Sequence, residues 1–342
     1  MSYKILNTLL PIGQTDKMFT DTIDMLMKGQ DLNKSSLADW GREALKAGGW
    51  WYGCEKAEDK EACIKQRITK FIELYHSINE KGYDGSIISI FFDKNGQIHV
   101  YDGYHRLAIM KYLNMRTKVN CVISTRDPNP AMRGDFPLAE AVIEINGGKH
   151  LYQPCDDSRL KDFKVWRHES VDRFNYILKH MIGKTVLDIG CSEGYFSREL
   201  AKKGFTVTAL DTDKRRIAIT RYLAITNSLR LNYYVGSWQE YLQSLEESIS
   251  FDNILFLSVF HHDMIKMKPS NAFAALRLFK GRAKRMFVEC PLKSSEVKWL
   301  PKEGQEMWNM SEEGFKRVLE ENIGMKVKDA FHGVRPIYLL VA

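Results

Sequence analysis

Two acidic residues stand at the ends of consecutive predicted strands in the C-terminal half. Asp188 lies in the strand over 185–189, directly before the loop that begins with Gly190, and Asp211 follows the strand over 206–210. The carboxyl ends of neighbouring parallel strands meet at one edge of a sheet, so we expect both carboxylates to face one ligand. There, Asp211 could accept hydrogen bonds from both hydroxyls of a ribose, and Asp188 could attract a cationic group.

The loop between these acids has the composition of a tight turn before a helix. Gly190 permits a sharp turn and the close approach of a ligand, and Gly194 opens a helix without steric conflict. Helix and strand patterns then alternate along the chain, at 195–203, 206–210, 215–227, 232–235, 253–259, 270–280, 285–289 and 337–341. This alternation predicts a parallel sheet with helices on both faces, a Rossmann-like α/β domain.

The order Asp-x-Gly-x-Ser-x-Gly over 188–194, followed by a strand that leads to Asp211, resembles the class I S-adenosylmethionine-dependent methyltransferases. The resemblance covers residues 171–342 and implies an enzyme that uses S-adenosyl-L-methionine as its cofactor. Ser192 stands where that family often has a third glycine. A nicotinamide dehydrogenase would need Gly-x-Gly-x-x-Gly, and Ser192 and Tyr195 occupy its second and third glycine positions.

The same resemblance implies which residues contact the cofactor. They lie in the glycine loop, after the second acid, in the segment 236–238 that the family places near adenine, and at the end of the fourth strand. The implied cofactor-binding residues are Asp188, Gly190, Cys191, Ser192, Gly194, Tyr195, Phe196, Asp211, Thr212, Ser237, Trp238 and Ser258.

His261 and His262 follow the fourth strand, at the rim where a methyl acceptor is expected. Transfer of the methyl group needs an aligned nucleophile, and a general base assists a hydroxyl. Histidine suits that role near neutral pH, and Asp263 could orient either imidazole. Glu289, at the end of the fifth strand, is the third candidate for a catalytic contact. Packing and loop anchoring are the alternative roles, and we predict no metal site because adjacent histidines on a strand point to opposite faces.

The N-terminal half contains a second motif between a predicted strand and a helix, formed by Asp102, Gly103, Tyr104, His105 and Arg106. Backbone N–H groups at a helix start and the forked guanidinium of Arg106 suit an anion such as phosphate. The motif resembles the ParB/sulfiredoxin-like superfamily over 86–124, which implies a nucleotide or phosphate site. Tyr104 replaces the sulfiredoxin cysteine, which excludes that chemistry. The alternative is an ion pair between Arg106 and Asp102 that only braces the domain.

The remaining patterns divide the chain into domains. Helical spacing over 16–28, 35–47 and 58–79 precedes a predicted hairpin, and proline and glycine concentrate over 126–165. We therefore predict an N-terminal α+β domain over 1–147, a connector over 148–170 and the methyltransferase domain over 171–342.

Composition sets wider limits. The chain has 342 residues and a formal net charge of +7, which suits two globular domains and permits an acidic partner without requiring one. None of the six cysteines forms a CxxC pair and the N-terminus has no signal-peptide pattern, so we expect reduced thiols and a cytoplasmic location. No run approaches the ~18 apolar residues of a membrane span.

Taken together, these features predict O-methylation of a sugar, a glycan or another small polar acceptor. In this prediction the N-terminal domain binds a phosphate or nucleotide part of the acceptor. An RNA-modifying methyltransferase is the first alternative, because basic residues suit a phosphate backbone. The second alternative is a nucleotide-responsive binding protein whose methyltransferase half no longer catalyses.

Overall fold

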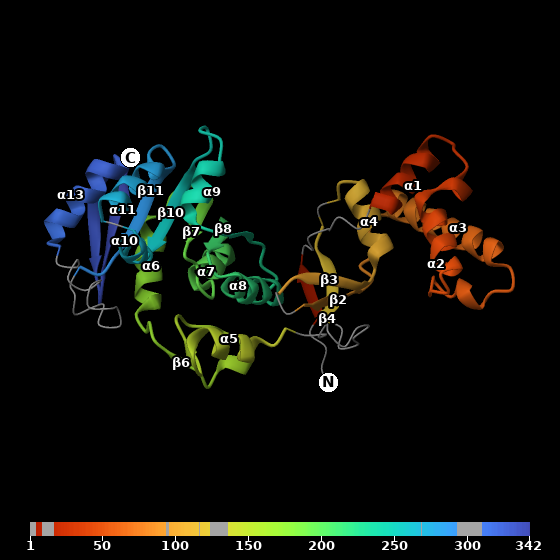
Figure 1. Ribbon diagram of the computed structural model, residues 1–342, viewed down its shortest axis with the longest axis horizontal. Coiled ribbons are helices and arrows are strands. Elements are labelled where there is room, and N and C mark those ends of the chain that lie inside the picture. Colours follow the sequence, from red (N-terminus) through yellow and green to blue (C-terminus); the bar gives the residue numbers. More distant parts are fainter. Residues whose placement is uncertain are drawn as a thin grey trace. The chain divides into compact units, whose positions relative to one another are not determined.

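The computed structural model divides the chain into two compact units, shown in Figure 1. The first comprises residues 1–93 and 98–135, and the second comprises residues 94–97 and 136–342. The structure describes residues 5–8, 17–93, 96–115, 117–123, 136–267, 269–292 and 310–342.

The described part of the first unit is rich in helices. They are α1 (Lys17–Met27), α2 (Ser36–Lys46), α3 (Lys60–Lys81) and α4 (Tyr104–Tyr112), with single turns at Leu32–Lys34 and Cys54–Lys56. Side chains that precede two of them cap the free backbone N–H groups, since Ser35 accepts from Ala38 N at 3.3 Å and Asp59 accepts from Ala62 N at 2.9 Å. The helix predicted over 58–79 is confirmed as α3, and its residues Ile64, Ile68, Phe71 and Tyr75 are buried.

A four-stranded sheet completes the first unit. Its order is β1 (Ile5–Thr8), β4 (Val119–Ile123), β2 (Ile88–Phe92) and β3 (Ile98–Asp102). Strands β2 and β3 pair antiparallel, which confirms the predicted hairpin, and β2 pairs parallel with β4. The predicted α+β character of this half is therefore correct.

One expectation about the cysteines is wrong. Cys54 and Cys63 form a disulfide. The single turn at Cys54–Lys56 and the first turn of α3 bring the two residues together with Cα atoms 5.6 Å apart. The remaining cysteines, among them the buried Cys121 and Cys191, form no disulfide within the described residues. Because disulfides are uncommon in reducing compartments, this pairing lends the expected cytoplasmic location no support.

The second unit is built on a seven-stranded sheet. Its order is β12 (Lys326–His332), β13 (Pro336–Val341), β11 (Ala283–Glu289), β10 (Phe251–Leu257), β7 (Thr185–Ile189), β8 (Thr206–Asp211) and β9 (Asn232–Val235). Strands β9, β8, β7, β10 and β11 run parallel, and β13 returns antiparallel to β11. The predicted Rossmann-like sheet is confirmed. The last predicted strand, β13, is antiparallel to its neighbour β11, and β12 was not predicted.

Apolar side chains alternate between the two faces of this sheet. Val186 and Leu255 contribute to one buried cluster, and Leu187 and Ile254 contribute to the other. From residue 170 onward, the described α-helices are α6 (Ser170–His180), α7 (Tyr195–Lys202), α8 (Lys214–Thr226), α9 (Trp238–Ser244), α10 (Phe260–Lys266), α11 (Pro269–Ala275) and α13 (Glu312–Ile323). No helix of the described segments is long and apolar enough to cross a membrane.

The stretch predicted as a connector has structure of its own. Residues 148–170 hold the short parallel pair β5 (His150–Leu151) and β6 (Lys164–Val165), and α5 (Leu138–Asn146), which precedes them, belongs to the same compact unit. The composition of this stretch is typical of a linker, but Leu151, Leu160 and Phe163 are buried, whereas Trp166 is exposed. Before α5, Phe136 is 2% exposed and packs against Tyr222 of α8, with ring centroids 5.2 Å apart.

Candidate active site

A glycine loop between β7 and α7 forms the centre of the site. Gly190 has a φ of +70° and Gly194 a φ of +74°, in the left-handed region that favours glycine. A Cβ atom on Gly190 would lie 2.4 Å from Cγ2 of Val259, and one on Gly194 would lie 2.3 Å from Cγ2 of Thr220. Both positions therefore require glycine, for the backbone conformation and for the close packing that holds the loop.

The two predicted carboxylates lie beside this loop. Asp188 is 3% exposed, and its Oδ2 accepts a hydrogen bond of 2.6 Å from the Ser197 hydroxyl. Asp211 accepts from the backbone N–H groups of Ser192, at 3.0 Å, and Asp213, at 2.9 Å. Strands β7 and β8 pair in parallel register, so both acids stand at the carboxyl edge of the sheet.

Burial makes both carboxylates harder to ionise. The pKa of Asp188 is raised to about 6, chiefly by burial and in part by the negative charge of Asp211, against the lowering effect of the Ser197 hydroxyl. Burial also raises the pKa of Asp211, while the N–H groups of Asp213 and Ser192 act in the opposite direction. Since a nearby cation favours the charged form of a carboxylate, this pair suits a positively charged ligand.

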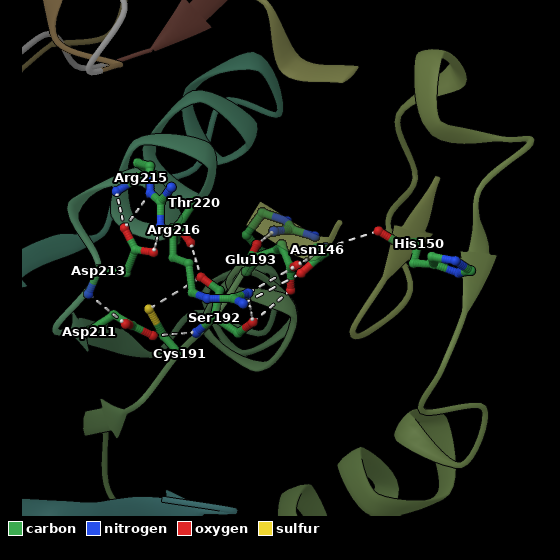
Figure 2. Close-up of polar contacts among 11 residues, drawn as sticks. Asn146, His150, Cys191, Ser192, Glu193, Asp211, Asp213, Arg215, Arg216 and Thr220 are labelled. Atoms are coloured by element: carbon green, nitrogen blue, oxygen red, sulfur yellow. Dashed lines mark hydrogen bonds and ion pairs between the residues drawn. The ribbon is translucent and has the colours of Figure 1, made fainter. Parts of the chain in front are cut away.

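Arg216 of α8 holds the glycine loop through an ion pair (Figure 2). Its Nη1 donates to Oγ of Ser192 at 2.8 Å and lies 3.2 Å from Oε1 of Glu193. The Glu193 carboxylate also accepts from Oγ of Ser192 at 2.7 Å and from Nδ2 of Asn146 at 2.8 Å. Asn146 is the last residue of α5, so this network ties the stretch 136–170 to the loop.

A second group of buried charges lies at the ends of β10 and β11. Glu289 is 0% exposed, and its carboxylate pairs with Arg167 at 3.1 Å and with Arg173. Ser258 donates its hydroxyl to the same carboxylate and accepts from Arg335 at 3.2 Å. Burial opposes ionisation, but the charges of Arg173 and Arg167 prevail and lower the pKa of Glu289. The structure thus gives Glu289 the role of positioning two arginines.

Two donors of Arg173 are available to a ligand. The side chain is 1% exposed, and its Nη2 donates to Glu289. Its Nε and Nη1 are buried and have no hydrogen-bond partner among the residues that the structure describes. The positive charge also acts on Asp188, whose pKa it lowers. Because a buried donor without a partner is costly, an acidic group of a ligand beside Asp188 would fit this position.

His261 and His262 begin a helix rather than extend a strand. Strand β10 ends at Leu257 and α10 begins at Phe260, and the two imidazole centroids lie 4.1 Å apart. The expectation that the two rings point to opposite faces is therefore wrong, because successive residues on a helix are rotated by about 100°.

The two histidines differ in access. His261 is 2% exposed, and burial lowers its pKa to about 2, whereas the ring of His262 is exposed. Partial burial also lowers the pKa of His262, so both imidazoles are neutral at pH 7. Asp263, which was expected to orient one of them, accepts hydrogen bonds from Trp238 Nε1 at 2.9 Å and Gln239 Nε2 at 3.3 Å.

Trp238, which was predicted to contact the cofactor, directs its side chain into the core. Trp238 is 3% exposed and stacks on Phe279 with centroids 4.7 Å apart, because the first turn of α9 directs the indole into the core. Ser237 caps α9, and its Oγ accepts from the Glu240 N–H at 3.2 Å. Of the other predicted cofactor contacts, the side chains of Cys191, Tyr195 and Phe196 are buried in apolar clusters, and Thr212 is exposed.

Sequence reasoning missed the charged residues that support the loop and the acids. Arg173 could have been found, since it lies next to Phe174 on the buried face of α6, where a charge needs a partner. Arg216, Glu193 and Asn146 gave no such signal, because only the folded chain brings them together.

In the first unit, the guanidinium of Arg106, which was predicted to bind an anion, forms hydrogen bonds with other residues of the chain. Arg106 donates to the Ser86 hydroxyl at 2.7 Å, to the Ile87 carbonyl at 3.1 Å and to Asp102 at 3.4 Å. Gly103, with a φ of +107°, precedes α4 as the turn predicted. This is the bracing role that the sequence left as the alternative.

The other members of that motif surround an aromatic interior. His105 lies 3.0 Å from the Tyr52 hydroxyl through Nε2 and contacts the Phe19 ring, with centroids 4.9 Å apart. Burial lowers the pKa of His105 to about 4, so it is neutral at pH 7. Tyr104 is half-buried at the start of α4.

Comparison with known proteins identifies the central part of the second unit. Residues 186–278 match the model of a family described as a methyltransferase domain. The match includes the glycine loop, both acids and the two histidines. The predicted enzyme class, a methyltransferase, and the predicted cofactor, S-adenosylmethionine, are confirmed for this domain.

Individual relatives match only parts of the chain. The O-antigen chain terminator bifunctional methyltransferase/kinase WbdD of Escherichia coli is 42% identical over 78 residues, which are 22% of this chain and 11% of that protein. The ubiquinone biosynthesis O-methyltransferase of Vibrio parahaemolyticus is 29% identical over 118 residues, 34% of this chain and 49% of that enzyme. A structure of WbdD aligns with a TM-score of 0.49 and 23% identity, over 60% of this chain and 46% of WbdD.

Proposed function

We propose that this chain transfers a methyl group from S-adenosylmethionine to an oxygen of a sugar, a glycan or another small polar acceptor. The observation that carries the proposal is the pair of buried carboxylates, Asp188 and Asp211, on either side of a glycine loop at the carboxyl edge of the sheet. This pair lies within the part that matches methyltransferase domains.

The residues of the site fit the chemical groups of that cofactor. Asp211, at the end of β8, would accept hydrogen bonds from the ribose hydroxyls. Asp188 would attract the amino group of the methionine part, and the two buried donors of Arg173 would bind its carboxylate. Gly190 and Gly194 let the loop pack closely on Val259 and Thr220.

When bound, the cofactor supplies an electrophilic methyl group on a positively charged sulfur. His262 would take the proton of the acceptor hydroxyl, because its exposed ring is neutral at pH 7. His261 is too buried to reach an acceptor in solution, and we assign it the support of the neighbouring ring. Glu289 would hold Arg173 and Arg167 in place.

The acceptor class draws support from the names of the relatives. One acts in ubiquinone biosynthesis as an O-methyltransferase, and the other terminates an O-antigen chain. Methylation of RNA and the binding protein with an inactive methyltransferase half stay alternatives from the sequence, and no contact in the described residues favours either. The ParB-like relationship of the first unit and its phosphate site also stay predictions, with Arg106 already engaged by Ser86 and Asp102.

Two measurements test the proposal. Calorimetry with S-adenosylmethionine and with S-adenosylhomocysteine should show saturable binding to the whole chain, and Arg173→Gln should weaken it. Protein incubated with methyl-labelled cofactor and fractionated cell extract should then label a small polar or glycan fraction. Absence of binding would refute the cofactor assignment, and label confined to RNA or protein would refute the acceptor class.

A further inference from the structure

Ser192 has an unfavourable backbone conformation within the glycine loop. Its φ is +54°, in the left-handed region that glycine adopts freely and that costs energy for other residues. The family that the sequence resembles often has glycine at this place. The residue is 8% exposed, so it is surrounded by the protein. A strained conformation of this kind persists only where neighbouring contacts fix it, and the contacts of Ser192 must therefore do so.

Side chains from α8 and from the loop hold Ser192 through its carbonyl and its hydroxyl (Figure 2). Thr220 donates its hydroxyl to the Ser192 carbonyl at 2.9 Å. Nη1 of Arg216 donates to Oγ of Ser192 at 2.8 Å, and that hydroxyl donates to Oε2 of Glu193 at 2.7 Å. The Glu193 carboxylate is 2% exposed, and its Oε1 lies 3.2 Å from the same nitrogen of Arg216. One guanidinium thus neutralises a buried acid and fixes the serine beside it.

Ser192 in turn fixes the carboxylate of Asp211. The Ser192 N–H donates to Oδ2 of Asp211 at 3.0 Å, and the Asp213 N–H donates to Oδ1 at 2.9 Å. Each carboxylate oxygen is held by one backbone N–H, which sets the plane of the carboxylate and leaves lone pairs for two ligand hydroxyls. If Ser192 left its left-handed conformation, one of these N–H groups would turn away and the carboxylate would be less firmly oriented.

We propose that Arg216 is a positioning residue for the cofactor, which acts through Ser192 to orient the Asp211 carboxylate toward the ribose hydroxyls. This inference rests on the proposed function, in which Asp211 binds the ribose. It also gives a reason why a serine can stand where glycine would be free of strain. Recognition of the ribose then depends on a guanidinium from a different element, α8.

The test is calorimetry on the whole chain with S-adenosylhomocysteine and with an analogue of it that lacks the ribose 2′-hydroxyl. In the unaltered protein the analogue should bind about tenfold more weakly, because it loses a hydrogen bond to a carboxylate. In Arg216→Gln this preference for the complete ribose should fall to about threefold or less, because Asp211 is no longer held in place. A general loss of stability would weaken both ligands equally, so the ratio of the two affinities distinguishes positioning from a merely structural role.

Variants of the serine test the same chain of contacts without removing the ion pair. Ser192→Ala keeps Arg216 paired with Glu193 but leaves a strained residue without its hydroxyl contact, so it should lower the preference as Arg216→Gln does. Ser192→Gly also removes the hydroxyl, but glycine adopts the left-handed conformation without strain and should retain most of the preference. Arg215→Gln is the control on α8. Arg215 pairs with Asp213 and Glu144, and its replacement should leave the preference unaltered.

The possible outcomes separate this inference from the proposed function. The inference alone is overturned if Ser192→Ala and Arg216→Gln keep the full preference for the complete ribose, if Ser192→Gly loses as much of it as Ser192→Ala, or if Arg215→Gln lowers it as much as Arg216→Gln. An unaltered protein that binds neither ligand contradicts the proposed function and this inference together. An unaltered protein that binds both ligands equally well contradicts the ribose assignment of Asp211, and this inference with it.

Discussion

Replacement of Asp188 by asparagine should stabilise the ligand-free protein and weaken the cofactor complex. The pKa of Asp188 is about 6 in the fold, against an ordinary value of 3.8. A carboxyl with a raised folded pKa stabilises the fold when protonated, and that contribution is lost as the pH rises through the folded pKa. Ionised Asp188 therefore destabilises the empty site at neutral pH, and asparagine removes that cost while it can still accept the Ser197 hydrogen bond.

The two pKa values set the magnitude. With these values, ionisation of Asp188 lowers the free energy of unfolding by about 3 kcal/mol at pH 7.5 and by about 1 kcal/mol at pH 4.5. The asparagine side chain is neutral at both pH values, so the gain from Asp188→Asn should shrink by about 2 kcal/mol between them. Loss of a charged partner should weaken S-adenosylhomocysteine binding by about 1.5–3 kcal/mol at pH 7.5.

Scanning calorimetry at both pH values measures the change in unfolding free energy. The transition to follow is the one that S-adenosylhomocysteine shifts to higher temperature in the unaltered protein. Titration calorimetry measures the affinity. Asp252→Asn is the matched control at the opposite edge of the sheet. The pKa of Asp252 is lowered by Lys284 and by the N–H groups of Lys184 and Thr185, so that change should destabilise the protein and spare cofactor affinity. A stability gain for Asp188→Asn that is equal at both pH values would refute the reasoning.

Three further predictions concern other parts of the chain. Asp211→Ala should weaken S-adenosylhomocysteine binding by about 1–3 kcal/mol in calorimetry, since ligand hydroxyls lose their acceptor; unchanged affinity would contradict the ribose assignment. His262→Ala should reduce transfer of labelled methyl to the acceptor fraction with little change in cofactor affinity, and the unaltered enzyme should stay active below pH 6.5 because the His262 pKa is lowered; full activity in the variant would exclude a base there. Cys54→Ser with Cys63→Ser should cost the first unit about 2–3 kcal/mol, measured by hydrogen exchange in α3, and should leave α7 unaffected; equal protection in both proteins would show that the disulfide contributes nothing.

The sheet of the second unit was predictable because its signals are local. Val186 and Leu187 belong to a short apolar strand, and Gly190 marks the turn that must follow. The carboxyl-edge rule then places Asp188 and Asp211 together without any knowledge of distant contacts. Strand β12 was missed because its burial is only partial along its length and alternation is weak.

The charged partners of the site were not predictable in the same way. The sequence indicates only a polar loop residue at Glu193. In the structure Glu193 is 2% exposed, and Arg216 and Asn146, from other elements, bind its carboxylate. The burial of the Trp238 ring was not predicted, because it follows from the phase of α9. Periodicity gives the face of an element but not the partner that the face meets.

The network around Asn146 decides where the catalytic half of this polypeptide can be cut. A fragment that begins at residue 171 would lack Asn146 and Arg167, which leaves buried Glu193 short of one donor and buried Glu289 with one arginine instead of two. Stranded buried charge of this kind destabilises a fold by several kcal/mol. The shortest autonomous enzyme should therefore start near Phe136, and recombinant versions trimmed to the glycine-loop sheet should precipitate or misfold.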